Sequence, residues 1–132
     1  MGIVLKEQGD QEKAIKSFKQ AIEIKPDFYE AYNNIGVVLK DQGDQEKAIE
    51  NYEHAVKIKA DYVEAYYNMG NAFKTQGKLD EAIEAYSKAV SIDPDYFKAY
   101  NNLGNSLRER GKFEDSIDAF NKALTILSLI HI

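Results

Sequence analysis

Residues 29–62, YEAYNNIGVVLKDQGDQEKAIENYEHAVKIKADY, return in recognisable form at residues 63–96 and again at residues 97–126. The glycines mark the period, because they form two series with steps of 34 residues: Gly2, Gly36, Gly70 and Gly104, and Gly9, Gly43, Gly77 and Gly111. Pro26 and Pro94 lie two such steps apart. Self-similarity at a fixed period of this length is typical of repeat architectures, in which each unit buries its apolar face against its neighbours.

Each unit reads as two amphipathic helices. The i, i+3, i+4, i+7 spacing that places side chains on one face of a helix is shown by Tyr32, Ile35, Gly36 and Leu39,. A second set with the same spacing comes later in the unit: Ala48, Ile49, Tyr52, Ala55 and Val56. Gly43 lies between the two sets, where a helix end favours a residue that adopts left-handed dihedrals easily. We therefore expect Gly43 and its equivalents to end the first helix of each unit.

Other small residues predict where the helices end and pack. Pro26 and Pro94 follow the second apolar pattern and should stop that helix, whereas Ala60 at the equivalent position should stop it less sharply. Glycines also stand inside the first helices, at a disadvantage of about 1 kcal/mol relative to alanine. Because Ala48 and Ala82 of the second helices are small as well, we expect close helix packing to require these glycines.

These residues resemble the tetratricopeptide repeat, a helix-turn-helix unit of 34 residues. The family's columns are matched by Tyr32, Ile35, Gly36, Leu39, Ala48, Tyr52 and Ala55, with Tyr32 in place of the common tryptophan. The resemblance implies an all-α, right-handed superhelical solenoid whose first helices line a concave groove. We expect an array over residues 1–126, consisting of a partial unit 1–28 and the units 29–62, 63–96 and 97–126.

Both ends of the array are expected to expose apolar surface, since repeat arrays need polar caps and neither end supplies one. The sequence opens within a first helix, and residues 127–132, LSLIHI, replace the expected short polar turn. Two interpretations of this tail stay open. It is either an apolar segment that docks beneath the last helix, or a non-native segment translated from a sequencing adapter, in which case the chain is a fragment of a longer array.

The composition is that of a soluble globular protein, with 44% hydrophobic and 30% charged residues in 132,. A net charge of −5 without a basic stretch argues against a nucleic-acid partner,. No apolar run approaches the roughly 20 residues that cross a bilayer, so no membrane partner is expected. The absence of cysteine excludes disulfides and thiolate chemistry,. A cytoplasmic location is weakly favoured.

One face of the first helices carries carboxamides. Asn34, Asn68 and Asn102 recur once per unit, and their neighbours on the same face are Asn33, Asn71, Asn101 and Asn105. A carboxamide both donates and accepts hydrogen bonds, so it matches the backbone of an extended peptide. The column resembles the asparagine ladder in the repeat arm of O-linked N-acetylglucosamine transferases. The alternative is that these asparagines are simply solvated.

A basic column lies near the end of the first helices: Lys6, Lys40, Lys74 and Arg108. It would attract an acidic ligand in the groove, or it complements the helix dipole, which is the interpretation we favour. Co-chaperone members of the family hold terminal carboxylates with a clamp of Lys, Asn and Arg. Asn68 and Lys98 fit that pattern, but Asn33, Val37 and Asn102 depart from it, so a carboxylate clamp is not expected.

Aromatic residues are expected to gather where units join, packing between repeats or stacking on a ligand: Tyr29, Tyr62, Tyr67, Tyr96 and Phe97. His54, among Tyr52, Glu53 and Lys57, is expected to be a solvated surface residue without a catalytic partner.

The sequence shows no phosphate-binding loop and no metal-ligand spacing, so we expect no enzyme, cofactor or metal. The predicted function is a scaffold that binds an extended peptide or a partner helix in its concave groove. Two alternatives stay open: a substrate-recruiting arm of a larger glycosyltransferase, and an assembly module that self-associates through its ends.

Overall fold

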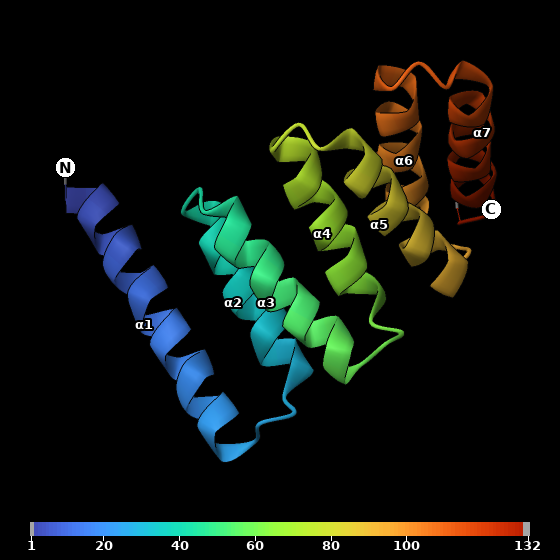
Figure 1. Cartoon of the computed structure of the whole chain (residues 1–132). Coiled ribbons are helices and arrows are strands. Elements are labelled where there is room, and N and C mark those ends of the chain that lie inside the picture. Colours follow the sequence, from blue (N-terminus) through green and yellow to red (C-terminus); the bar gives the residue numbers. More distant parts are fainter. Residues whose placement is uncertain (1, 131–132) are drawn as a thin grey trace. The chain divides into compact units, whose positions relative to one another are not determined.

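The computed structural model describes residues 2–130, with side chains from Glu7 onwards. The described residues form seven helices: α1 (Gly2–Ile24), α2 (Tyr29–Asp41), α3 (Gln45–Ile58), α4 (Val63–Thr75), α5 (Leu79–Ile92), α6 (Phe97–Glu109) and α7 (Phe113–Ile130). Two compact units divide the chain, Met1–Ala60 with α1 to α3 and Asp61–Ile132 with α4 to α7. Within them, α2 pairs with α3, α4 with α5, and α6 with α7 (Figure 1).

The turn glycines end the first helices as predicted. Gly43 has a φ of +86°, and Gly77 and Gly111 follow it at +78° and +88°. The Gly43 N–H donates to the Lys40 carbonyl at 2.9 Å, and the Asp44 N–H donates to the Leu39 carbonyl at 2.9 Å. This pair of bonds is the Schellman motif, which satisfies carbonyls at the helix end and requires a left-handed residue at the glycine.

The break expected at Gly9 is absent, because α1 runs unbroken from Gly2 to Ile24. Gly9 has no positive φ, and a Cβ on it would meet nothing within 4 Å. Glycine accepts helical dihedrals as readily as left-handed ones. The helix therefore continues through Gly9.

The expectation of a weaker helix end at Ala60 is wrong. The residue that closes α3, Lys59, has φ −125° and ψ 96°, and Asp93, which closes α5 directly before Pro94, has φ −123° and ψ 94°. Each donates its N–H at 2.9 Å to the carbonyl four residues earlier, Ala55 and Ala89 respectively. Lys59 is extended before Ala60 just as Asp93 is extended before Pro94. A following proline favours this conformation, but the helix end at Lys59 shows that the ring is not required.

The helical glycines are required by aromatic rings rather than by the small alanines. A Cβ on Gly70 would lie 2.5 Å from the Tyr86 ring, and one on Gly104 would lie 2.8 Å from the Phe120 ring. Gly36 has the same relation to Tyr52. These separations are shorter than van der Waals contact. Each first helix therefore has no side chain at the point where the aromatic ring of its partner helix crosses it.

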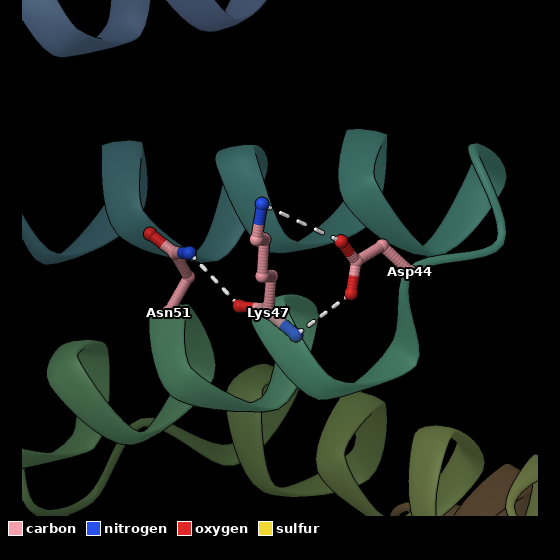
Figure 2. Close-up of polar contacts among 3 residues, drawn as sticks. All are labelled: Asp44, Lys47 and Asn51. Carbon is pink, nitrogen blue, oxygen red and sulfur yellow. Dashed lines mark hydrogen bonds and ion pairs between the residues drawn. The ribbon is translucent and has the colours of Figure 1, made fainter.

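The start of α3 has a side-chain cap (Figure 2). The Asp44 carboxylate accepts a hydrogen bond from the Lys47 backbone N–H at 3.1 Å, and the Lys47 ammonium lies 3.9 Å from the other carboxylate oxygen. Asn51 Nδ2 donates to the Lys47 carbonyl at 2.9 Å one turn later. At the equivalent position of α5, Lys78 makes no side-chain cap.

The described part of the tail, residues 127–130, continues α7 instead of forming a turn or folding back beneath the helix. Helix α7 extends to Ile130, whereas its equivalents α3 and α5 end at Ile58 and Ile92. Leu129 and Ile130 are exposed, and Leu127 is half-buried. The prediction for this tail also covered His131 and Ile132, which lie outside the described residues.

Candidate functional site

The predicted carboxamides lie on the first helix of each pair, with different exposure. In the unit Met1–Ala60, α2 carries Asn33, which is 4% exposed, and Asn34, which is exposed. In the unit Asp61–Ile132, α4 and α6 carry the rest: Asn68, Asn71, Asn102 and Asn105 are half-buried, and Asn101 is exposed. The column is therefore not uniformly solvated.

Two of these asparagines belong to a polar network that joins α4, α5 and α6. The Tyr86 hydroxyl donates to Asn71 Oδ1. Asn102 Nδ2 donates to the same oxygen at 3.0 Å and to the Tyr67 hydroxyl at 3.2 Å. Such a network holds its members in one orientation, because each polar group is positioned by a neighbour on another helix.

The network decides which polar atoms are left for a ligand. A carboxamide has two N–H donors and one carbonyl. Asn102 uses both donors internally, so its Oδ1 acceptor remains. Asn71 Oδ1 accepts twice, and its Nδ2 makes no hydrogen bond with any residue that the structure describes. The two side chains together offer one acceptor and one donor group.

The same network does not recur in the other helix pairs. Val37 stands where Asn71 does, and the hydroxyl of its partner Tyr52 is buried without a hydrogen bond among the described residues. In α6 and α7 the position of Tyr86 is taken by Phe120, and Asn105 accepts from Arg108 Nη2 at 3.2 Å. This difference was not predicted from the sequence. The signal that could have revealed it is the presence of both the carboxamide and the tyrosine in only one unit.

The basic column sits at the ends of the first helices. Lys40, Lys74 and Arg108 each lie in the last turn of their helix, where a cation complements the dipole,. The Arg108 guanidinium also lies 5.9 Å from the centre of the Phe120 ring. The side chain of the fourth predicted member, Lys6, lies outside the described side chains.

Aromatic side chains cluster beside the network. The Tyr67 ring lies 5.0 Å from the Tyr96 ring and 6.0 Å from the Tyr86 ring. Burial raises the pKa of Tyr96 to about 12, with smaller contributions from Tyr67, Glu64 and Asp93. Burial also raises the pKa of Tyr86 above its usual range, helped by Tyr67 and opposed by the neighbouring Asn102 carboxamide. These tyrosines therefore act as neutral packing and hydrogen-bonding groups.

A cavity of 540 Å³ opens beside Asn101 and Asn102, between α6 and α7. Its walls are mainly apolar and include Phe97, Phe120 and Leu124, with Lys98 at its polar side. Largely apolar cavities with a few polar groups are the usual form of a binding site.

No group of three or more metal-ligating side chains occurs within residues 2–130. His54 is exposed, and its ring stacks on Tyr32 with centres 4.9 Å apart. None of the described helices is long and apolar enough to span a membrane.

Comparison with known proteins supports the 34-residue repeats found in the sequence. A family model described as TPR repeat matches residues 2–43, 38–77 and 70–107, and one described as tetratricopeptide repeat matches residues 97–127. No curated protein sequence matches. The crystal structure of MamA protein is 30% identical, with a TM-score of 0.80 over 88% of this chain and 63% of that one. MamA 41-end from Desulfovibrio magneticus RS-1 is 27% identical, with a TM-score of 0.80 over 97% of this chain and 72% of that one.

The chain thus spans less than two thirds of the first MamA structure. Every described element is a helix, the helices are paired as the 34-residue pattern predicts, and the family models match nearly the whole sequence. The predicted all-α repeat fold is confirmed. The chain belongs to the tetratricopeptide repeat family.

Proposed function

We propose that the chain is a protein-interaction scaffold that binds an extended segment of a partner protein along α4 and α6, with Asn71 and Asn102 as the pair that recognises a backbone amide. The family match supports a scaffold in general terms. The observation that carries the finer proposal is the polar network of the second unit, which orients both carboxamides through Tyr67 and Tyr86.

The chemistry of the pair fits a peptide. A backbone amide offers one N–H donor and one carbonyl acceptor, and the pair leaves one acceptor, on Asn102, and one donor group, on Asn71. Because the network holds these groups before the ligand arrives, less rotamer entropy is lost on binding. Recognition through the backbone reads no side chains, so the proposed specificity is broad.

An array of overlapping peptides, followed by calorimetric titration of the strongest binder, tests the proposal. Asn102→Ala should weaken binding about twofold to tenfold, the range expected for one lost hydrogen bond. Asn121→Ala, on α7 and outside the network, is the matched control and should leave affinity unchanged. Circular dichroism melts verify that both variants fold.

A methylation scan of the peptide backbone gives the sharper readout. N-methylation at the recognised residue removes the donor proposed to meet Asn102 Oδ1, so it should weaken binding to the wild type but add little loss in Asn102→Ala. An N-methyl penalty that is the same in both proteins at every position would disprove recognition by Asn102. If no peptide of the array binds, the proposed function as a whole is contradicted.

A further inference from the structure

Two cations of the second unit have no carboxylate partner. Lys74 and Arg108 lie one 34-residue period apart, each in the last turn of its helix, α4 and α6 respectively. Neither lies within ion-pair distance of a carboxylate among the side chains that the structure describes. By contrast, Arg110, just after α6, bonds to Asp80 Oδ1 at 2.8 Å. In a chain with a net charge of −5, two equivalent cations without a carboxylate distinguish this surface from the rest of the molecule.

Helical spacing puts both cations on the face that carries the carboxamides. Lys74 follows Asn71 by three residues on α4, and residues at this spacing are neighbours on a helix surface,. Arg108 follows Asn105 by three residues on α6 in the same way. The two helices meet at this face, because Asn102 Nδ2 of α6 donates to Asn71 Oδ1 of α4 at 3.0 Å. The cations therefore lie on the same side of α4 and α6 as the proposed peptide site.

Arg108 is held in position by its own neighbours. Its Nη2 donates to Asn105 Oδ1 at 3.2 Å, and its guanidinium lies 5.9 Å from the centre of the Phe120 ring. The side chain is exposed, so its other N–H groups are available to a ligand. Asn105 Nδ2 makes no hydrogen bond with any residue that the structure describes. Arg108 and Asn105 together present only N–H donors, which is the arrangement that binds an anionic oxygen.

Lys74 adds a second charge on the neighbouring helix. Its side chain is half-buried, and Asn71, one turn earlier, offers its Nδ2 donor. Glu109 follows Arg108 directly in sequence, but consecutive residues of a helix do not face each other,. Both cations complement a helix dipole, and that role leaves their N–H donors unused.

We propose that the partner segment carries an acidic side chain, aspartate or glutamate, which binds to Lys74 and Arg108 while Asn71 and Asn102 bind the backbone. This inference rests on the proposed function and names the chemistry of its ligand. Three residues of a helix advance about 4.5 Å, and an extended peptide advances about 3.3 Å per residue. The acidic residue is therefore expected within about three residues of the recognised amide.

The probe is the strongest binder from the peptide array, made with a C-terminal amide so that no terminal carboxylate contributes. Each of its acidic residues is replaced in turn by the matching carboxamide, and binding to the full chain is measured by calorimetry. One replacement, within about three residues of the amide that the methylation scan locates, should weaken binding about threefold to tenfold. On the double variant Lys74→Gln with Arg108→Gln, the same replacement should have no effect.

Lys57→Gln is the matched control. Lys57 likewise lies in the last turn of a helix, α3, and complements its dipole, but it is outside the polar network,. Its replacement should leave peptide affinity unchanged.

The inference is overturned if the strongest binder has no acidic residue within that range, or if no replacement weakens binding. It is also overturned if the double variant still distinguishes the acidic peptide from its carboxamide form, or if Lys57→Gln weakens binding as much as the double variant does. The proposed function survives each of these results as long as Asn102→Ala weakens binding. If no array peptide binds, both are contradicted.

Discussion

The Tyr86 hydroxyl of α5 donates a hydrogen bond to the Asn71 carboxamide of α4, whereas the Tyr52 hydroxyl, one period earlier, is buried and has no partner among the described residues. The difference lies in the first helix, where Val37 replaces the asparagine. A buried polar group without a hydrogen bond costs about 1–3 kcal/mol. The residue at this position of the first helix thus decides whether the tyrosine hydroxyl of the second helix has a hydrogen-bond partner.

Val37→Asn should therefore stabilise the first unit, by about 1 kcal/mol, since it supplies an acceptor for the Tyr52 hydroxyl. Val37 is exposed, so little apolar burial is lost. Urea denaturation gives the change in the free energy of unfolding. In a Tyr52→Phe background the gain should vanish. An equal gain in both backgrounds would show that the hydroxyl is not its source.

Gly70→Ala should destabilise the chain by about 1–3 kcal/mol, because the new methyl group overlaps the Tyr86 ring and overpacks the α4–α5 contact,. Gly9→Ala is the matched control. Its Cβ meets nothing within 4 Å and its residue is helical, so the change should stabilise α1 by about 0.5–1 kcal/mol. Thermal melts of the two variants should shift in opposite directions. A destabilised Gly9→Ala would contradict the continuous α1.

Asp44→Ala should lower stability by about 0.5–2 kcal/mol, the usual cost of losing a side-chain cap. The reverse change, Lys78→Asp, introduces a cap at the start of α5, where the backbone dihedrals match those of Asp44. It should raise stability by about 1 kcal/mol. Chemical denaturation measures both. The interpretation fails if Lys78→Asp has no effect while Asp44→Ala does.

The chain should lose stability as the pH rises above about 10. Burial raises the pKa of Tyr96 to about 12 and raises the pKa of Tyr52 and Tyr86 as well. Unfolded tyrosines release their protons near pH 10, so above that pH the unfolded state binds fewer protons than the folded state. The free energy of unfolding then falls with pH until the folded tyrosines titrate.

The test compares the wild type with Tyr96→Phe at several pH values between 8 and about 12. The difference in unfolding free energy between the two proteins should be constant below pH 10 and should change in favour of Tyr96→Phe above it. The comparison removes the contributions of lysines and arginines, which are the same in both. A pH-independent difference would contradict a raised pKa at Tyr96.

Several features of the site were predictable only in part. Helical spacing predicts Asn71 and Asn102 on first helices, and they lie on α4 and α6. The expectation that each carboxamide offers both donor and acceptor is wrong for Asn102, whose donors are taken by Tyr67 and Asn71. Those partners are 35 and 31 residues away in sequence, so no local pattern reveals them.

The repeat, the helix pairs and the glycine turns were readable from the sequence because they depend on local physics: a 3.6-residue period, a positive φ at Gly43 and apolar stripes at fixed spacing. The aromatic rings against the helical glycines and the polar atoms left on Asn71 and Asn102 were decided by tertiary structure. Each of these depends on which side chains of another helix lie within contact distance, and that distance is set by packing rather than by position along the chain.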